Sequence, residues 1–212
     1  MSNPKIARKE RRVAARKRQI IEAALKVFLE KGFNQATTKE IAEAADIAEG
    51  TIYNYFKNKG DLLLEMISTL ASLEERQKFF DESLDMDFQE FLVEYSRRRN
   101  RDLGDGYNLL ISLLPALIEN PTIRQRYNQE IVQPATDMFE KHLQERIDRG
   151  QLKPMEDLPL VTRLLTGASL GAWLLIILGD PVMLEAMKDP ERFMNVGINT
   201  LYGQFLPDAD ET

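Results

Sequence analysis

The sequence of 212 residues contains no cysteine and only one histidine, His142. Without cysteine, the chain has no disulfide, no thiolate nucleophile and no cysteine-ligated metal. A single histidine also disfavours a histidine-based metal site or a Ser-His-Asp triad, and no phosphate-binding loop is visible. We therefore expect no catalytic residues, no metal site and no cofactor, so an enzyme is disfavoured.

Long hydrophobic runs are also missing. The longest uncharged run, Leu164–Leu178, is shorter than the roughly 20 residues that a membrane span needs. The N-terminus is charged and has no apolar segment behind it, which argues against a signal peptide. Hydrophobic residues make up 43% of the chain, enough to bury a core. These features predict a soluble, cytoplasmic, all-α protein without membrane association.

Charge is distributed unevenly along the chain. Residues 1–60 carry 13 Lys and Arg against 7 Asp and Glu, whereas the remaining residues have a net charge of −12. A basic head on an acidic body indicates a polyanionic partner, although a solvated tail would show the same imbalance. Residues 1–15 have no apolar face before Val13, so they form either a disordered tail or a basic arm that contacts phosphates or a minor groove.

Residues 37–60 predict two short helices, at about Thr38–Ala45 and Glu49–Phe56, joined by a three-residue turn. A preceding helix, Arg16–Lys31, would end at Gly32 and complete a three-helix unit. Such a unit is a helix-turn-helix, whose second short helix enters the major groove of DNA. The pattern by itself would also fit an ordinary helical hairpin.

The stretch from Gly32 to Leu63 reads G-F-x-x-A-T-T-x-x-I-A-x-x-A-x-I-A-x-G-T-I-Y-N-Y-F-K-N-K-x-D-L-L. It closely resembles the DNA-binding signature of TetR-family transcriptional repressors, with Gly60 in place of the charged residue common there. The resemblance implies phosphate contacts from Thr37, Thr38, Tyr55 and Lys59. It implies base or sugar contacts from Lys39, Glu49, Gly50, Thr51, Tyr53 and Asn54. Glu49 would be unfavourable near phosphate unless it accepts a hydrogen bond from a cytosine amino group.

The rest of the sequence predicts a helical body. We expect helices at about Asp61–Phe80, Phe88–Arg101, Tyr107–Glu119, Thr122–Arg149, Leu158–Gly179 and Pro190–Leu206. Pro115 and Pro134 should kink two of them and leave space for a ligand. The predicted domains are therefore 1–62, a helix-turn-helix domain that includes the 1–15 arm, and 63–212, an effector-binding and dimerisation domain.

Apolar side chains of the body could line an effector site. The candidates are Phe91, Tyr95, Leu110, Leu114, Leu117, Met138 and Trp173, although core packing is the commoner role of Trp. They suit a hydrophobic or aromatic compound or an acyl chain. Arginines at positions 97, 98, 99 and 101 would suit an acyl-CoA, but they also suit the end of a helix, where cations are favoured.

Two C-terminal helices have the composition of a subunit interface. Gly167 and Gly171 lie four residues apart and permit a close helix crossing, with Leu175 and Leu201 as further candidates. We expect a homodimer with a four-helix interface. The resemblance then implies a repressor that binds a pseudo-palindromic double-stranded DNA operator and is released by a small hydrophobic effector. The alternative is an effector-free or partner-controlled DNA-binding regulator.

Overall fold

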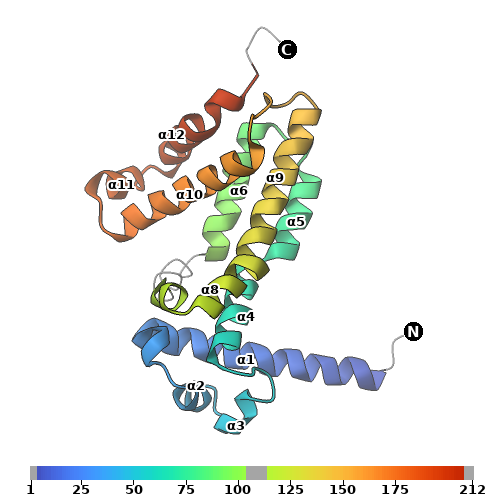
Figure 1. The fold of residues 1–212 in the computed structure, drawn as a ribbon, viewed down its shortest axis with the longest axis vertical. Coiled ribbons are helices and arrows are strands. Elements are labelled where there is room, and N and C mark those ends of the chain that lie inside the picture. Colours follow the sequence, from blue (N-terminus) through green and yellow to red (C-terminus); the bar gives the residue numbers. More distant parts are fainter. Residues whose placement is uncertain (1–3, 104–113, 208–212) are drawn as a thin grey trace. The chain divides into compact units, whose positions relative to one another are not determined.

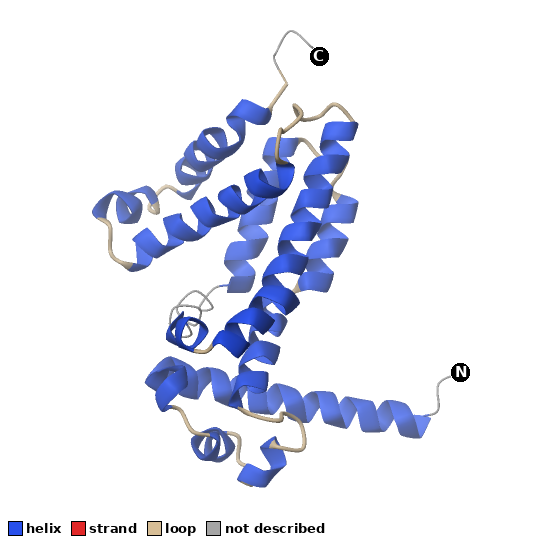
Figure 2. Cartoon of the chain, in the orientation of Figure 1, coloured by secondary structure: helices blue, strands red, loops and turns tan. Residues whose placement is uncertain are grey.

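The computed structural model describes residues 4–103 and 114–207, and all regular structure in those ranges is helical (Figure 2). The all-α prediction is confirmed. The chain divides into two compact units. The first comprises Met1–Ala71 and Asp105–Ile131, and the second comprises Ser72–Gly104 and Val132–Thr212. The boundary predicted after residue 62 falls inside a helix that belongs to the first unit.

The first unit is built around the predicted helix-turn-helix (Figure 1). Its helices are α1 (Pro4–Gln35), α2 (Thr38–Ala44), α3 (Glu49–Ile52), α4 (Lys59–Ala71), the helical residues 114–119 and α8 (Pro121–Tyr127). Its core is apolar and includes the buried Ile20, Ala24, Phe28, Ile41, Ala42, Ile52, Phe56, Leu62, Leu63 and Met66. Because these side chains come from α1 to α4 and, in the case of Phe56, from the turn between α3 and α4, their burial fixes the relative position of the four helices.

Two features of the head differ from the prediction. Residues of the expected arm are helical from Pro4, so α1 extends through the basic segment instead of beginning at Arg16. Non-helical φ and ψ angles of 73° and 160° at Gly32 mark the predicted end of its regular part. The α-helical part of α3 ends at Ile52, and residues up to Phe56 follow as turns, with the amide of Tyr55 donating to the carbonyl of Ile52 at 2.9 Å.

The second unit is a helical bundle. It contains α5 (Leu73–Glu82), α6 (Phe88–Leu103), α9 (Gln133–Asp148), α10 (Leu158–Ile177), α11 (Pro181–Ala186), α12 (Pro190–Tyr202) and the short 3-10 helix η2 (Gly203–Phe205). The six-residue helix α11 was not predicted from the sequence. The predicted last helix, 190–206, is shorter and finishes as η2.

Aromatic side chains fill the core of this bundle. Phe91 has no exposed surface and stacks on the rings of Phe79 and His142 at centroid distances of 5.6 and 4.2 Å. The ring of Phe80 lies 5.0 Å from that of His142. Burial, together with the neighbouring Arg146 cation, lowers the pKa of His142 to about 3, so the imidazole is neutral at physiological pH.

Two predicted long helices are interrupted. The helix expected over 61–80 breaks at Ser72, whose positive φ of 46° ends α4 before α5 begins. The helix expected over 122–149 contains the π-helical stretch η1, Asn128–Val132, directly before α9. Pro134 explains this irregularity, since proline cannot donate a hydrogen bond to the carbonyl four residues earlier and its ring crowds that turn. Pro115 lies in the described helical residues 114–119. The preceding turn, which it should kink, and the predicted helix start at Tyr107 lie outside the described residues.

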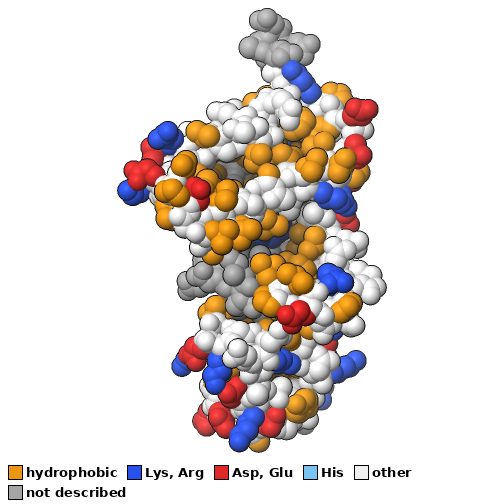
Figure 3. Space-filling model, turned by 60° about the vertical axis from the view of Figure 1, so that its left-hand side comes forward, with side chains coloured by type: hydrophobic (Ala, Val, Ile, Leu, Met, Phe, Trp, Pro, Cys, Tyr) orange, Lys and Arg blue, Asp and Glu red, His pale blue; other side chains and the backbone are white. Residues whose placement is uncertain are grey.

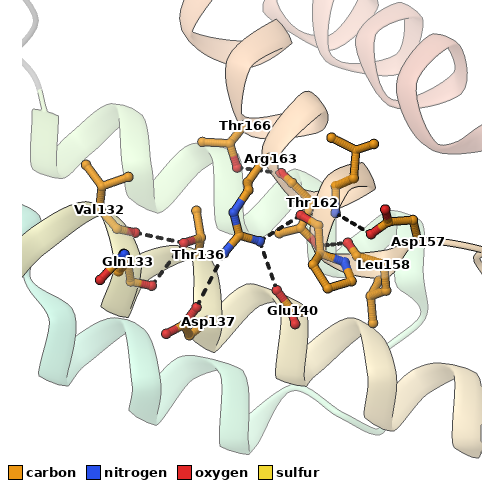
Figure 4. A network of polar contacts seen from close by, with 12 residues as sticks. Val132, Gln133, Thr136, Asp137, Glu140, Asp157, Leu158, Thr162, Arg163 and Thr166 are labelled. Atoms are coloured by element: carbon orange, nitrogen blue, oxygen red, sulfur yellow. Dashed lines mark hydrogen bonds and ion pairs between the residues drawn. The ribbon is translucent and has the colours of Figure 1, made fainter. Parts of the chain in front are cut away.

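Polar contacts tie α10 to α9 (Figure 4). Arg163 on α10 points toward α9, where Nη1 lies 3.1 Å from Glu140 Oε2 and Nη2 lies 3.8 Å from Asp137 Oδ1. The hydroxyl of the buried Thr162 donates to the carbonyl of Leu158 within α10 itself. One side of α10 is therefore fixed to the bundle at its N-terminal half.

The remaining surface of α10 is apolar and exposed. Its exposed leucines are Leu160, Leu164, Leu170, Leu174, Leu175 and Leu178, and Val182, Leu184 and Val196 continue the patch on α11 and α12. Figure 3 shows apolar side chains gathered over this part of the molecule. In the described part of the chain, α10 is the helix that is long and apolar enough to cross a membrane by length and composition. The helix is longer than the uncharged run at 164–178 because it also includes Arg163 and the residues before it.

Candidate nucleic-acid interface

The turn between α2 and α3 is held by local interactions. Thr37 caps α2 and forms a capping box with Glu40. In the turn, Asp46 has a φ of 51°, a left-handed conformation that aspartate tolerates better than most residues. The amide of Ile47 donates to the carbonyl of Ala42 at 3.0 Å, which closes the turn. These contacts fix the direction in which α3 leaves the turn.

One side of α3 is buried and the other is open to solvent. Ile52 and Phe56 are buried, whereas Glu49, Gly50 and Asn54 are exposed and Tyr53 has 52% of its surface exposed. Thr51 and Tyr55 are half-buried, and Lys39 of α2 is exposed. The structure thus brings the predicted base-contacting residues together on one accessible surface.

Glu40 is held as an anion beside this surface. Hydrogen bonds from Lys31 and from the backbone and side chain of Thr37 lower the pKa of Glu40 to about 2. The hydroxyl of Thr37 lies 2.9 Å from Glu40 Oε2 and donates to it. That hydroxyl hydrogen is already used within the capping box. For Thr37 to make the predicted phosphate contact, its hydroxyl would have to give up the hydrogen bond to Glu40.

Lys59 lies against protein carbonyl groups. Its Nζ donates to the carbonyl oxygens of Phe33 at 2.6 Å, Asn34 at 3.3 Å and Ala36 at 2.8 Å. The ammonium also lies 4.4 Å from the centre of the Phe33 ring, and burial lowers the pKa of Lys59. A cation is favoured there because the carbonyls at the end of a helix lack partners and carry partial negative charge. Lys59 therefore joins the start of α4 to the end of α1.

Replacing Lys59 with alanine should mainly destabilise the head. Three carbonyls would lose a charged donor, so we expect Lys59→Ala to lower the free energy of unfolding by about 2 kcal/mol in urea denaturation. Lys57→Ala is the matched control, because Lys57 is exposed, and it should change stability by less than about 0.5 kcal/mol. Unchanged stability of Lys59→Ala, together with weaker salt dependence of DNA binding, would favour the phosphate contact implied by the resemblance.

A residue distant in sequence supports α4 within the first unit. Arg126 of α8 forms ion pairs with Asp61 and Glu130. A Cβ atom added at Gly60 would lie 3.2 Å from Ile123 Cδ1, which explains why the small residue suits this position. The ion pair between Arg126 and Asp61 was not predictable, because no local pattern relates Asp61 to a residue so much later in the chain.

The candidate effector residues fall in different places. Phe91, Tyr95 and Met138 belong to or pack against the aromatic core of the second unit. Leu114 and Leu117 belong to the first unit, where Leu117 is buried. Trp173 is half-buried on α10, and Leu110 lies outside the described residues.

The candidate interface residues on α10 are accessible. Gly167, Gly171 and Leu175 are exposed, and a Cβ atom added at either glycine would meet open space. Leu201 on α12 is half-buried against the aromatic core. The three α10 residues can therefore contact another molecule, whereas part of the Leu201 side chain is already used for packing.

A helix-turn-helix with an exposed third helix, attached to a helical bundle, is the architecture of a DNA-binding transcriptional regulator. Residues 20–66 match the family described as bacterial regulatory proteins, tetR family. The fatty acid metabolism regulator protein of Bacillus subtilis (strain 168) is 30% identical over 156 residues, which cover 70% of this chain and 77% of that protein. The chain belongs to the TetR family of transcriptional regulators.

Solved structures have the same fold. The regulator FadR from Bacillus subtilis, in complex with stearoyl-CoA, has a TM-score of 0.68 and 26% identity, covering 88% of this chain and 97% of that one. A TetR-family regulator from Mesorhizobium loti has a TM-score of 0.70 and 21% identity, covering 92% and 99%. These similarities extend through the helical body as well as the head.

Proposed function

We propose that this protein is a dimeric repressor that binds a pseudo-palindromic operator and is released by a long-chain acyl-CoA in the cytoplasm. The observation that carries the choice of effector is the similarity, over most of both chains, to a fatty acid metabolism regulator and to a structure holding stearoyl-CoA. Among the effector classes that the sequence left open, it favours the acyl type.

The exposed side of α3 supports operator binding. Gly50, Tyr53 and Asn54 are exposed to solvent, and the hydrogen-bonded turn before α3 holds that segment in place. Residues that contact base edges must be accessible in this way. Two copies would present two such surfaces to successive major grooves, about 34–36 Å apart. Phosphate contacts would come from the basic residues around α3 and from the helical arm at the start of α1.

The charged end of α6 supports an anionic effector. Arg98 pairs with Glu94 at 2.8 Å and lies over the Phe79 ring, so it is already occupied. Arg99 differs, because its buried Nη1 has no hydrogen-bond partner among the residues that the structure describes. A buried guanidinium nitrogen without a partner is costly, and a phosphate or carbonyl oxygen of an acyl-CoA would satisfy it.

The effector assignment can be tested with purified protein and DNA from upstream of its gene. We expect stearoyl-CoA to release the DNA, whereas free CoA, which lacks the acyl chain, should not. Arg99→Met should weaken stearoyl-CoA binding about tenfold, measured by isothermal titration, because a charge-assisted hydrogen bond is lost. Arg97→Met is the control, because Arg97 is exposed.

The outcomes separate the alternatives. Specific DNA binding that stearoyl-CoA does not affect would contradict the acyl-CoA assignment. If drug-like aromatic compounds also had no effect, the effector-free or partner-controlled regulator would be favoured. Loss of DNA release in Arg97→Met but not in Arg99→Met would contradict the role given to Arg99.

A further inference from the structure

Three side chains on the exposed surface of the head form a directed chain of hydrogen bonds. Thr38 Oγ1 lies 2.6 Å from Glu49 Oε1 and 3.1 Å from the hydroxyl oxygen of Tyr53. A carboxylate only accepts, so Thr38 donates its single hydrogen to Glu49. Thr38 then has only lone pairs left for Tyr53, and the phenol must be the donor in that contact. Both hydroxyl hydrogens are consequently used within the protein.

This arrangement determines what the surface offers to DNA. With both hydrogens engaged, the three side chains present only acceptors, namely the carboxylate of Glu49 and the remaining hydroxyl lone pairs. Acceptors are unfavourable opposite phosphate oxygens. In the major groove they are also unfavourable opposite guanine, which shows two acceptors, and opposite the O4 of thymine. Adenine places its N7 acceptor beside its amino group, whereas cytosine shows an amino donor alone.

We propose that Glu49, positioned by Thr38 and Tyr53, selects cytosine at one position of each operator half-site. The inference rests on the proposed operator binding and names a specificity-determining residue within it. It differs from the phosphate contact that the family resemblance implies for Thr38, because the hydroxyl hydrogen of Thr38 is directed to Glu49. Thr38 and Tyr53 act here as positioning residues that hold the carboxylate at the start of α3.

Selection of binding sites from DNA randomised over a half-site tests the role of Glu49. The wild-type protein should enrich cytosine at one position. Glu49→Gln should shift that position to adenine, because an amide pairs with both N6 and N7 of adenine, and it should bind the cytosine-containing site roughly tenfold more weakly. Preferences at the other positions should persist. Glu49 is exposed, so the variant should fold, which thermal denaturation can verify.

Thr38→Val separates positioning from phosphate binding, because valine keeps the shape and removes the hydroxyl. We expect a weaker cytosine preference and an unchanged salt dependence. A lost phosphate contact would instead lower the slope of log affinity against log salt by about 0.9 per contact. Specific binding with the same base preferences in wild type and Glu49→Gln would overturn the inference and leave operator binding intact. No sequence enrichment by the wild type would overturn both.

Discussion

Replacing Leu174 with glutamate should convert the proposed dimer to a monomer and abolish the proposed high-affinity operator binding. Leu174 lies on α10 in an exposed series that repeats every four and three residues, Leu160, Leu164, Gly167, Gly171, Leu174 and Leu178. This spacing is that of a helix seam packing against a partner helix. A carboxylate buried without a partner in such a seam is strongly unfavourable.

The effect on DNA binding should be large because the two heads of the proposed dimer would act together. Once one head is bound, linkage raises the effective concentration of the other, so loss of the dimer should weaken operator binding by about 10²- to 10⁴-fold. Light scattering after gel filtration measures the mass, and a gel-shift titration measures the affinity. Gln89→Glu is the matched control, because it adds the same charge at an exposed site of the same unit. A dimeric Leu174→Glu protein would show that this seam is not the interface.

Removing the guanidinium of Arg146 should strongly destabilise the second unit. Arg146 has no exposed surface, and its hydrogen-bond partners are all uncharged. Nε donates to His142 Nε2 at 2.9 Å and Nη2 to the Ser83 carbonyl at 2.7 Å. Nη1 donates to the Met86 carbonyl at 2.9 Å and to Gln151 Oε1 at 3.1 Å. One side chain thereby holds the loop after α5 against α9.

We expect Arg146→Ala to lower the free energy of unfolding by about 3–5 kcal/mol, because buried carbonyls lose their donors and a cavity forms. Arg149→Ala provides the comparison, since Arg149 forms an ion pair at 2.8 Å with the exposed Asp85. Exposed pairs contribute at most about 1 kcal/mol. Urea denaturation of both variants measures the difference. Equal free energies of unfolding for the two variants would mean that Arg146 stabilises the protein no more than a surface charge does.

Features set by neighbouring residues were predictable from the sequence. The capping box of Thr37 and Glu40, the turn at Asp46 and the end of the regular part of α1 at Gly32 all depend on residues a few positions apart. The head and the all-helical class follow from such local signals together with hydrophobic periodicity. The resemblance to the TetR family arose from the same segment.

Features that depend on distant residues were not predictable. Lys59 gives the same sequence signal whether it faces a phosphate or the carbonyls at the end of α1. The burial of Arg146 depends on carbonyls some sixty positions earlier in the chain. The break at Ser72 also has no local signal, because neither glycine nor proline lies there. In each case tertiary packing outweighs local preference.

The ion pair between Arg126 and Asp61 affects the order in which the protein can fold during synthesis. The first unit includes Asp105–Ile131, so the helix-turn-helix leaves the ribosome well before the segment that supports α4. At about 5–20 residues per second, the delay between Ala71 and Ile131 is on the order of several seconds. During that interval α8 has not yet been synthesised, so Ile123 cannot pack against Gly60 in the nascent head. A protein that assembles in this order completes its first unit only after α5 and α6 of the second unit have been synthesised, and before α9 to α12 have been.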